Sequence, residues 1–396
     1  MSNRITKIAF TAITVLAMSQ AKADTIPSPL AGPVQWRASV AVSPAFVPGT
    51  NSFLRGENPD ESRISSALSS GIRLDFSFNP ASREGMLYPG LYQGVGVDMN
   101  TFFHRDLLGT PVSLFLYQGA PIAHLGRRLW IGYEWEFGAA FGWKHETEEH
   151  PQYNTAVSTS VTAHIRAAFK FHYNVSDHMI LSAGLAATHY SNGNTSWPNK
   201  GVNTLGASIA LTYLFNPYAG DTPATSAELK QEADKGRWFY DITAYGAVRK
   251  RVVTINDAPQ MCPGRFGVAG IQFAPMRRLN RWVAVGPSLD IQFDESAGLE
   301  PYWVQWTTGD DIKFHRPPFG KQLSAGLSAH AELTMPIFSV NAGIGYDFVN
   351  PAGNQRFYQS LALKAFVTRH IYVNVGYRLG DFKRPQNLML GAGVRI

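Results

Sequence analysis

The sequence predicts an all-β chain that forms an antiparallel transmembrane β-barrel of the outer-membrane type. Long stretches alternate between apolar and polar residues, and the composition is 12% aromatic but only 16% charged. The mean hydropathy is −0.13. Soluble proteins are about a quarter charged, whereas strands with one lipid-facing and one lumen-facing side average to neutral hydropathy. A soluble two-sheet sandwich is the alternative, but its strands usually have only about 5–6 residues.

The N-terminus is typical of a signal peptide over residues 1–23. Arg4 and Lys7 precede an apolar stretch, residues 8–18, and Ala21-Lys22-Ala23 fits a small-x-small cleavage site. The apolar stretch is too short to cross a bilayer, and no later stretch reaches the roughly 20 apolar residues of a transmembrane helix. We therefore expect an exported chain whose mature part starts at Asp24.

Charge and cysteine content narrow the choice of partners. The formal net charge is +6, but the cations are scattered and form no basic run. This pattern gives no indication of nucleic-acid binding and suits an anionic lipid. The single cysteine, Cys262, cannot form an intrachain disulfide and is expected to be an ordinary loop residue.

The clearest alternation runs from residue 129 to residue 143. Its odd positions are apolar or aromatic, whereas its even positions include Glu134 and Glu136. Period-two patterning over more than about 10 residues, with aromatic residues at the ends, indicates a strand with one face to lipid and one to a polar lumen. We expect the two carboxylates to pair inside the barrel with Arg166 and Lys170 of the next strand, rather than to form a paired-carboxylate site.

The first half of the chain, residues 24–217, has eight such segments. Short turns such as 175–177 are expected on the periplasmic side, and long connections such as 144–157 and 192–202 on the outside. The expected strands are 34–42, 68–77, 91–101, 111–119, 130–143, 158–175, 179–191 and 203–215.

Residues 218–237 interrupt the alternation and are expected to form a linker. A second half, residues 238–396, follows with expected strands at 239–249, 265–275, 283–293, 322–334, 337–347, 357–367, 371–380 and 387–396.

The two halves resemble a diverged duplication. Val175-Ser176-Asp177-His178-Met179 in the first half matches Val367-Thr368-Arg369-His370-Ile371 in the second. One large barrel of roughly sixteen strands would leave no open edge. Two tandem barrels of eight strands would also close. We favour the single large barrel.

One strand carries a candidate reactive pair on its lipid-facing side. The outward row of strand 179–191 ends in His189 and Ser191, about 6.6–7 Å apart along the strand. A serine hydroxyl needs a neighbouring base to become a useful nucleophile. Asn203 starts the next strand on the same face. Alternation alone leaves two interpretations open, an interfacial polar cap or a catalytic group.

The local sequence resembles one enzyme family. His189-Tyr190-Ser191-Asn192-Gly193-Asn194, followed by Pro198-Asn199-Lys200-Gly201-Val202-Asn203, is similar to the PagL-type lipid A 3-O-deacylases. The resemblance implies an outer-membrane barrel with its active site on the outer wall. It also implies hydrolysis of the ester at the 3 position of lipid A, within lipopolysaccharide, without a cofactor.

By this resemblance, His189 is the general base and Ser191 the nucleophile. Asn192 and Gly193 would lie near the developing oxyanion, and Asn199 would be a further donor. The family's third catalytic member is usually a glutamate, whereas this chain has Asn203. Asparagine can orient an imidazole through its carbonyl but cannot stabilise the imidazolium with a full charge.

The sequence is also compatible with two other functions. A non-enzymatic barrel, either a porin or a structural protein, and a phospholipase-type hydrolase are the alternatives to the deacylase.

No metal site is expected, because the histidines of the run 145–150 are five residues apart, whereas zinc proteases use i, i+4 spacing. Asp381 and Lys383 would occupy the His189 and Ser191 positions of the second half, which is therefore expected to lack this chemistry.

Overall fold

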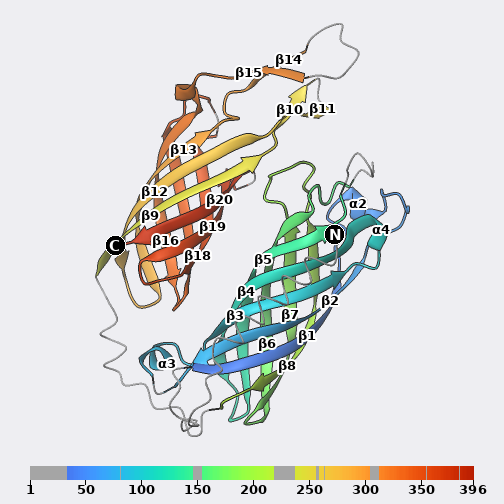
Figure 1. The fold of residues 1–396 in the computed structure, drawn as a ribbon, viewed down its shortest axis with the longest axis vertical. Helices are drawn as coiled ribbons and strands as arrows, with labels where there is room; N and C mark the ends of the chain where they lie inside the picture. The colour runs from blue at the N-terminus through green and yellow to red at the C-terminus, as the bar shows by residue number, and fades with distance from the viewer. Residues whose placement is uncertain are drawn as a thin grey trace, which may run out of the picture.

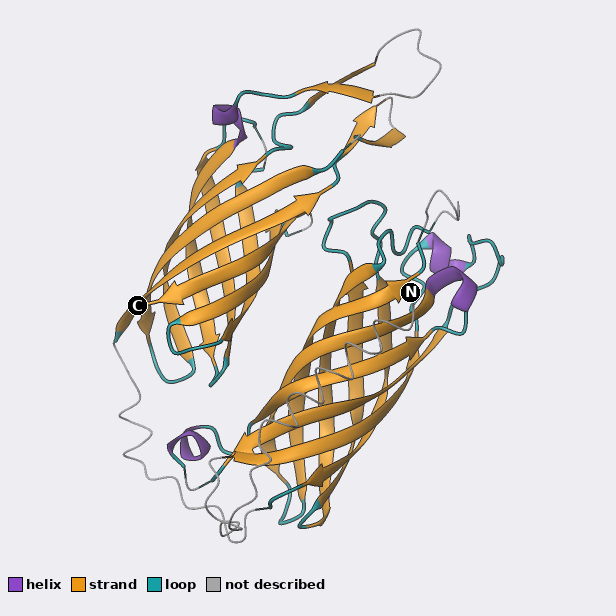
Figure 2. Cartoon of the chain, viewed as in Figure 1, coloured by secondary structure: helices purple, strands orange, loops and turns teal. Residues whose placement is uncertain are grey.

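The computed structural model describes residues 34–80, 82–145, 154–217, 237–255, 258–262, 264–303, 312–353, 355–382 and 384–396. The fold is all-β, and its main strands form two closed antiparallel barrels of eight strands each (Figures 1 and 2). The expected signal peptide and residues 218–236 of the expected linker lie outside the described residues. Among the described helices, none is long and apolar enough to span a membrane.

The first barrel contains the first eight strands in chain order. Each strand pairs with its sequence neighbours, and the last closes on the first. The strands are β1 (Val34–Phe46), β2 (Ser66–Phe78), β3 (Tyr92–Thr101), β4 (Gly109–His124), β5 (Leu129–Trp143), β6 (Val161–Ser176), β7 (Met179–Ser191) and β8 (Val202–Leu214).

The second barrel closes between its own first and last strands. Its strands are β9 (Trp238–Arg249), β12 (Phe266–Arg278), β13 (Val283–Asp294), β16 (Leu323–Thr334), β17 (Phe338–Val349), β18 (Phe357–Phe366), β19 (Ile371–Gly380) and β20 (Arg384–Arg395).

Short elements occupy the connections between barrel strands. Two hairpins, β10–β11 and β14–β15, extend from the second barrel. The bounds are β10 (Val252–Ile255), β11 (Ala258–Met261), β14 (Glu300–Trp303), β15 (Ile312–His315), α2 (Ser52–Arg55), α3 (Arg83–Leu87), α4 (Arg105–Leu108) and η1 (Phe319–Gln322).

The barrel class is confirmed, but the preference for one large barrel was wrong. β1 pairs with β8 from Arg37–Leu214 to Phe46–Leu205, and β20 pairs with β9. In each group of eight strands, the first and last strands therefore pair with each other and close the sheet. An eight-stranded barrel has an interior just wide enough for side chains to fill, and polar side chains fill both interiors here.

Alternation places apolar side chains outside and polar side chains inside. Along β7 the outward residues Leu181, Ala183 and Leu185 are exposed, whereas Ser182 on the inward face is buried. A wall of exposed apolar residues around a polar interior is typical of a transmembrane barrel.

The interior of the first barrel is filled by ion pairs. Lys170 contacts Glu134, and Arg166 Nε lies 3.8 Å from Glu136 Oε1. The alternation predicted both of these pairs. Arg73 Nη2 also lies 2.8 Å from Glu136. These side chains are buried, so each charge depends on its partner for solvation. The lumen is thus a packed polar core.

Apolar side chains close one end of the first barrel, the end with the long connections, which is called its outer end. The helices α2 and α4 and the nearby connections contribute to one buried cluster above the ion pairs. Its larger members are Phe53, Leu54, Ile64, Phe102, Leu107, Leu108, Trp143 and Tyr190. This cluster supports the ends of β7 and β8 from the inside.

The two barrels share one turn structure, as the proposed duplication expects. In the β6–β7 turn, His178 Nδ1 lies 2.9 Å from the Leu214 carbonyl oxygen. In the β18–β19 turn, His370 Nδ1 lies 2.9 Å from the Arg395 carbonyl oxygen. Each histidine therefore fastens its turn to the last strand of its own barrel.

Candidate active site on the outer wall of the first barrel

His189 and Ser191 stand at the outer end of β7 on the exterior face. Tyr190, between them, points inward and is buried in the apolar cluster, where its hydroxyl donates to Asn100 Oδ1 at 3.0 Å. This anchor holds the strand so that both neighbouring side chains leave the same outer face. His189 and Ser191 are both half-buried.

The side chain of Asn203 orients His189. The two residues are direct partners in the β7–β8 ladder, and His189 Nδ1 lies 2.7 Å from Asn203 Oδ1. Because an amide oxygen can only accept, the imidazole donates through Nδ1–H. The other ring nitrogen, Nε2, then carries the lone pair, which is the arrangement that a general base requires.

Gly201 leaves space beside the side chains of both His189 and Ser191. Its φ is +73°, and a Cβ at this position would lie 3.1 Å from His189 Cε1 and 3.8 Å from Ser191 Cβ. No hydrogen bond joins His189 to Ser191 among the described residues. Catalytic hydrogen bonds are often long in unliganded sites and tighten when substrate binds, so the arrangement is compatible with a nucleophile and base pair.

Asn192 belongs to the framework of the loop that follows β7. Its backbone N–H donates to Asn199 Oδ1 at 3.0 Å, and its side-chain amide donates to Ser158 Oγ and to the Ser196 carbonyl. The side chain is buried. These N–H groups are already engaged, so the geometry favours a structural contribution from Asn192 over donation to an oxyanion.

Gly193 and Asn199 retain donors near the serine. Gly193 has a φ of +62°, and its N–H has no hydrogen-bond acceptor among the described residues. Asn199 uses its oxygen to accept from Asn192, which leaves its amide nitrogen as a donor. The loop is tied to the 154–158 segment through Gly201 N–H, which donates to the Ala156 carbonyl at 2.9 Å.

An apolar groove runs along the outer wall directly below His189. It has a volume of about 680 Å³ and crosses strands β6, β7 and β8. Ala167, Ala187 and Leu205 form the ladder row immediately below His189, and Phe169, Leu185 and Ala207 form the next row. Each of the three strands thus contributes one alanine and one bulky side chain to these two rows.

The alternating pattern of the sequence does not predict this groove. The alternation assigned its residues to the lipid-facing side without distinguishing a flat wall from a hollow one. The available signal was the presence of alanine at outward positions 167, 187 and 207, where a barrel exterior usually has larger apolar residues. Cross-strand register was needed to place these alanines together.

The second barrel does not repeat the site. β19 ends at Gly380, and Asp381, which would correspond to His189, lies in a tight turn with a φ of +46°. The corresponding Lys383 lies outside the described residues. Within the described ranges no cluster of histidine, cysteine and carboxylate side chains could hold a metal. Residues 146–150 of the acidic run lie outside those ranges.

The comparisons with known proteins identify two family matches. Residues 118–212 match the family described as lipid A 3-O-deacylase (PagL). Residues 238–396 match the family described as acyloxyacyl hydrolase, C-terminal domain. The first match contains His189, Ser191 and Asn203, and the second covers the whole second barrel. Among curated proteins, no relative matches the chain.

Solved structures give only distant similarities. The deltaS2 mutant of the TodX monoaromatic hydrocarbon channel is 10% identical, with 91% of this chain and 88% of that chain covered and a TM-score of 0.18. The siderophore receptor PirA from Acinetobacter baumannii is 9% identical, with 90% and 68% covered and a TM-score of 0.19. With such TM-scores these similarities carry no argument about this chain.

Proposed function

Because the chain belongs to the PagL family of lipid A deacylases, we propose that it hydrolyses the 3-O-linked acyl ester of lipid A at His189 and Ser191. The observation that carries this proposal is the His189–Asn203 hydrogen bond beside Ser191, directly above an apolar groove. The proposed base and the proposed nucleophile leave the same face of β7, and the apolar groove lies next to them.

The proposed reaction begins with attack of Ser191 Oγ on the ester carbonyl carbon. His189 Nε2 accepts the hydroxyl proton as the new C–O bond forms. The tetrahedral intermediate then expels the sugar hydroxyl, which takes that proton from His189. Water hydrolyses the resulting acyl-serine in the same way and releases the fatty acid. Both steps use the same base, so one correctly oriented imidazole is sufficient.

Negative charge on the carbonyl oxygen needs donors in both steps. Gly193 N–H and the Asn199 amide nitrogen are the proposed donors, because each lies in the loop that follows Ser191 and neither is used by another described residue. Asn192 N–H is engaged with Asn199 and is proposed to hold this donor in place. A single donor of this kind contributes about 3–4 kcal/mol of transition-state stabilisation in an ester- or amide-cleaving enzyme.

The acyl chain is proposed to lie in the groove below His189. Hydrolysis of a membrane lipid requires the ester to stay at the polar boundary while its chain remains in an apolar environment. The groove begins one ladder row below the histidine and is lined by alanine, leucine and phenylalanine side chains. Substrate would therefore enter sideways from the outer leaflet of the bacterial outer membrane.

The lumen of the first barrel supports the enzyme over a pore through this barrel. Ion pairs fill the middle of the first barrel, and the apolar cluster covers its outer end. Among the described residues, the interior of the first barrel is thus occupied by paired charges and capped by apolar side chains. The exterior site, by contrast, has a groove and an oriented base.

Mass spectrometry of lipid A from cells that express the protein tests this proposal. Wild type should release one 3-hydroxyacyl chain, and Ser191→Ala should release none. Ser70→Ala is the matched control, because Ser70 lies on β2 in ladder register with the exterior residues Val42 and Met99. It should behave as wild type.

Two outcomes would contradict the proposal. Unchanged lipid A from correctly inserted wild-type protein, repeated in detergent, would exclude the deacylase. Release of a phospholipid acyl chain instead, with the same dependence on Ser191, would identify a phospholipase.

A further inference from the structure

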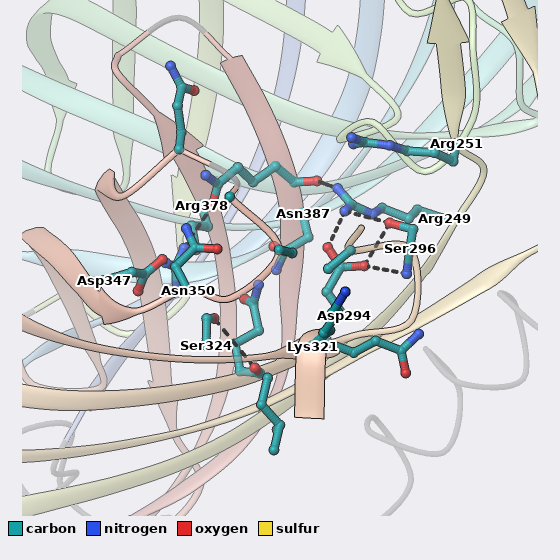
Figure 3. Close-up of a pocket in the computed structure, with 18 of the residues that line it drawn as sticks. Arg249, Arg251, Asp294, Ser296, Lys321, Ser324, Asp347, Asn350, Arg378 and Asn387 are labelled. Carbon is teal, nitrogen blue, oxygen red and sulfur yellow. Dashed lines mark hydrogen bonds and ion pairs between the residues drawn. The ribbon is translucent and has the colours of Figure 1, made fainter. Parts of the chain in front are cut away.

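A polar pocket opens at the mouth of the second barrel, outside the site described above. Its volume is about 310 Å³. Figure 3 shows the side chains that line it. Five cationic side chains line it, whereas only two carboxylates, Asp294 and Asp347, do so. The cations are Arg249, Arg251, Lys321, Arg378 and Arg384.

Two of these cations are neutralised by the two carboxylates. Arg378 Nη2 lies 2.6 Å from Asp347 Oδ2, and Arg249 contacts Asp294 and donates to Ser296 Oγ at 2.9 Å. These contacts fix both guanidinium groups in the wall of the pocket. The buried Nε of Arg249 has no hydrogen-bond partner.

Three cations remain uncompensated. Among the described residues, no carboxylate lies within ion-pair distance of Arg251, Lys321 or Arg384. The deeper interior of the same barrel differs, because Lys364 and Arg395 both contact Asp241 and Glu332 there, two charges against two. The deeper interior is thus balanced in charge, whereas the mouth has three cations without a carboxylate partner among the described residues.

The pocket faces the same side of the membrane as the candidate active site. Strand β9 begins at Trp238 and ends at Arg249, so these two residues lie at opposite ends of the second barrel. Because the first barrel has an even number of strands, the chain leaves it on the side where it entered, and β9 begins on that side. The connections at the Arg249 end are long, as in 250–265 and 295–322, whereas the other end has only short turns. In the first barrel, Ser191 also lies at the long-loop end, which is the outer side.

We propose that this mouth pocket binds the phosphate group of a phosphorylated sugar at the outer surface. Arginine presents a planar fork that matches phosphate oxygens and is weakly hydrated compared with lysine. Arg251 and Arg384 supply two such forks, and Lys321 adds a point charge. The volume is in the range of about 300–1,000 Å³ that holds small-molecule ligands. Amide side chains such as Gln322 and Asn387 also line the pocket, and the buried Oδ1 of Asn387 has no hydrogen-bond partner among the described residues, so it can accept from a sugar hydroxyl.

Calorimetric titration of the full-length protein in nonionic detergent tests the proposal. Glucosamine 1-phosphate and inorganic phosphate are the two probes, and unphosphorylated glucosamine is the blank. Wild type should bind the sugar phosphate saturably and more tightly than inorganic phosphate. Arg251→Gln combined with Arg384→Gln should raise the dissociation constant at least tenfold, which corresponds to about 1.4 kcal/mol.

Arg369→Gln is the matched control, because it removes one exposed cation from the β18–β19 turn at the opposite end of the barrel. Its dissociation constant should stay within twofold of wild type. Absence of saturable binding in wild type, or equal weakening by the control, would overturn the site. Equal affinity for the two probes would overturn the sugar headgroup and leave free phosphate as the ligand.

The variants should keep both barrels folded, since neither Arg251 nor Arg384 forms an ion pair in the described structure. Heat-modified migration on a gel checks this directly. A single Lys321→Gln variant gives a second measurement and should weaken binding by a smaller factor. All titrations use the Ser191→Ala background, so the result does not depend on whether the first barrel hydrolyses lipid A.

Discussion

The imidazole Nδ1 of His189 and the Oδ1 atom of Asn203 lie 2.7 Å apart on paired positions of adjacent strands. An uncharged amide thus occupies the place for which the resemblance to the PagL-type deacylases implies a carboxylate. The hydrogen bond selects the tautomer that the proposed general base requires, but it offers no full charge to the imidazolium that the proposed reaction would form.

Replacement of Asn203 should separate the effect of orienting the His189 imidazole from the effect of a negative charge beside it. Asn203→Ala should lower kcat by at least about tenfold, because the imidazole loses a hydrogen bond whose net contribution is about 1 kcal/mol and also loses its orientation. Asn203→Asp should raise kcat, with about 10⁴-fold as the upper bound set by the acid-to-amide change in a serine protease. Initial rates of fatty-acid release from lipid A in detergent measure both. A slower Asn203→Asp enzyme would show that the amide is adapted to this site.

Gly201 should be intolerant of a side chain. Gly201→Ala places a Cβ 3.0 Å from the Tyr190 carbonyl oxygen and 3.1 Å from His189 Cε1, at a φ of +73°. Misplacement of a catalytic group by about 1 Å can cost about 10²-fold in rate, so activity should fall by that order while the barrel stays folded. Gly264→Ala is the control, because Gly264 also has a positive φ but has no atom within 4 Å of the added Cβ. Equal loss in both variants would assign the effect to backbone strain.

The groove below His189 should set the length of the acyl chain that is released. Ala187→Phe fills the row next to the histidine and should reduce kcat/KM for long chains by about 10–200-fold, the effect of small steric changes in apolar pockets. Short chains should be affected less. Competition between substrates of different chain length, followed by mass spectrometry, measures the change. Ala183→Phe, further along the same outward row and outside the groove, should leave the preference unaltered.

The interior ion pairs should matter for stability. Lys170→Met leaves Glu134 buried without its cation, and breaking a buried pair in this way costs about 3–5 kcal/mol. The Glu134→Met and Lys170→Met double variant should recover part of that loss, although the Tyr92 hydroxyl loses its Glu134 acceptor. Urea unfolding in lipid vesicles, monitored by tryptophan fluorescence, gives both values. A double variant as unstable as the single one would contradict the pairing.

Cys262 should react slowly in the folded protein. Burial raises the pKa of its thiol, with a smaller opposing influence of Arg251. A raised pKa lowers the thiolate fraction at any pH below it, and the thiolate is the reactive form. Iodoacetamide labelling at pH 8 should therefore be much slower in folded protein than in urea-unfolded protein. Equal rates would show that the thiol is accessible and unshifted.

The sequence alone determined the sixteen barrel strands and the face on which their side chains lie, but it did not predict the short hairpin strands β10, β11, β14 and β15. Alternation is local, because successive residues of a strand point to opposite sides. All sixteen barrel strands therefore lie where the pattern predicted them, and Glu134 and Lys170 meet inside the barrel as expected. The same periodicity put His189, Ser191 and Asn203 on one outer face.

Only the tertiary structure decided how the strands close and what each face contains. Closure depends on pairing between distant residues, such as Arg37 with Leu214, and on how many strands the interior side chains can fill. Cross-strand register gathered Ala167 and Ala187 into a groove. Likewise, the hydrogen bonds that engage Asn192 follow from how its loop folds, and alternation carries no information about loops.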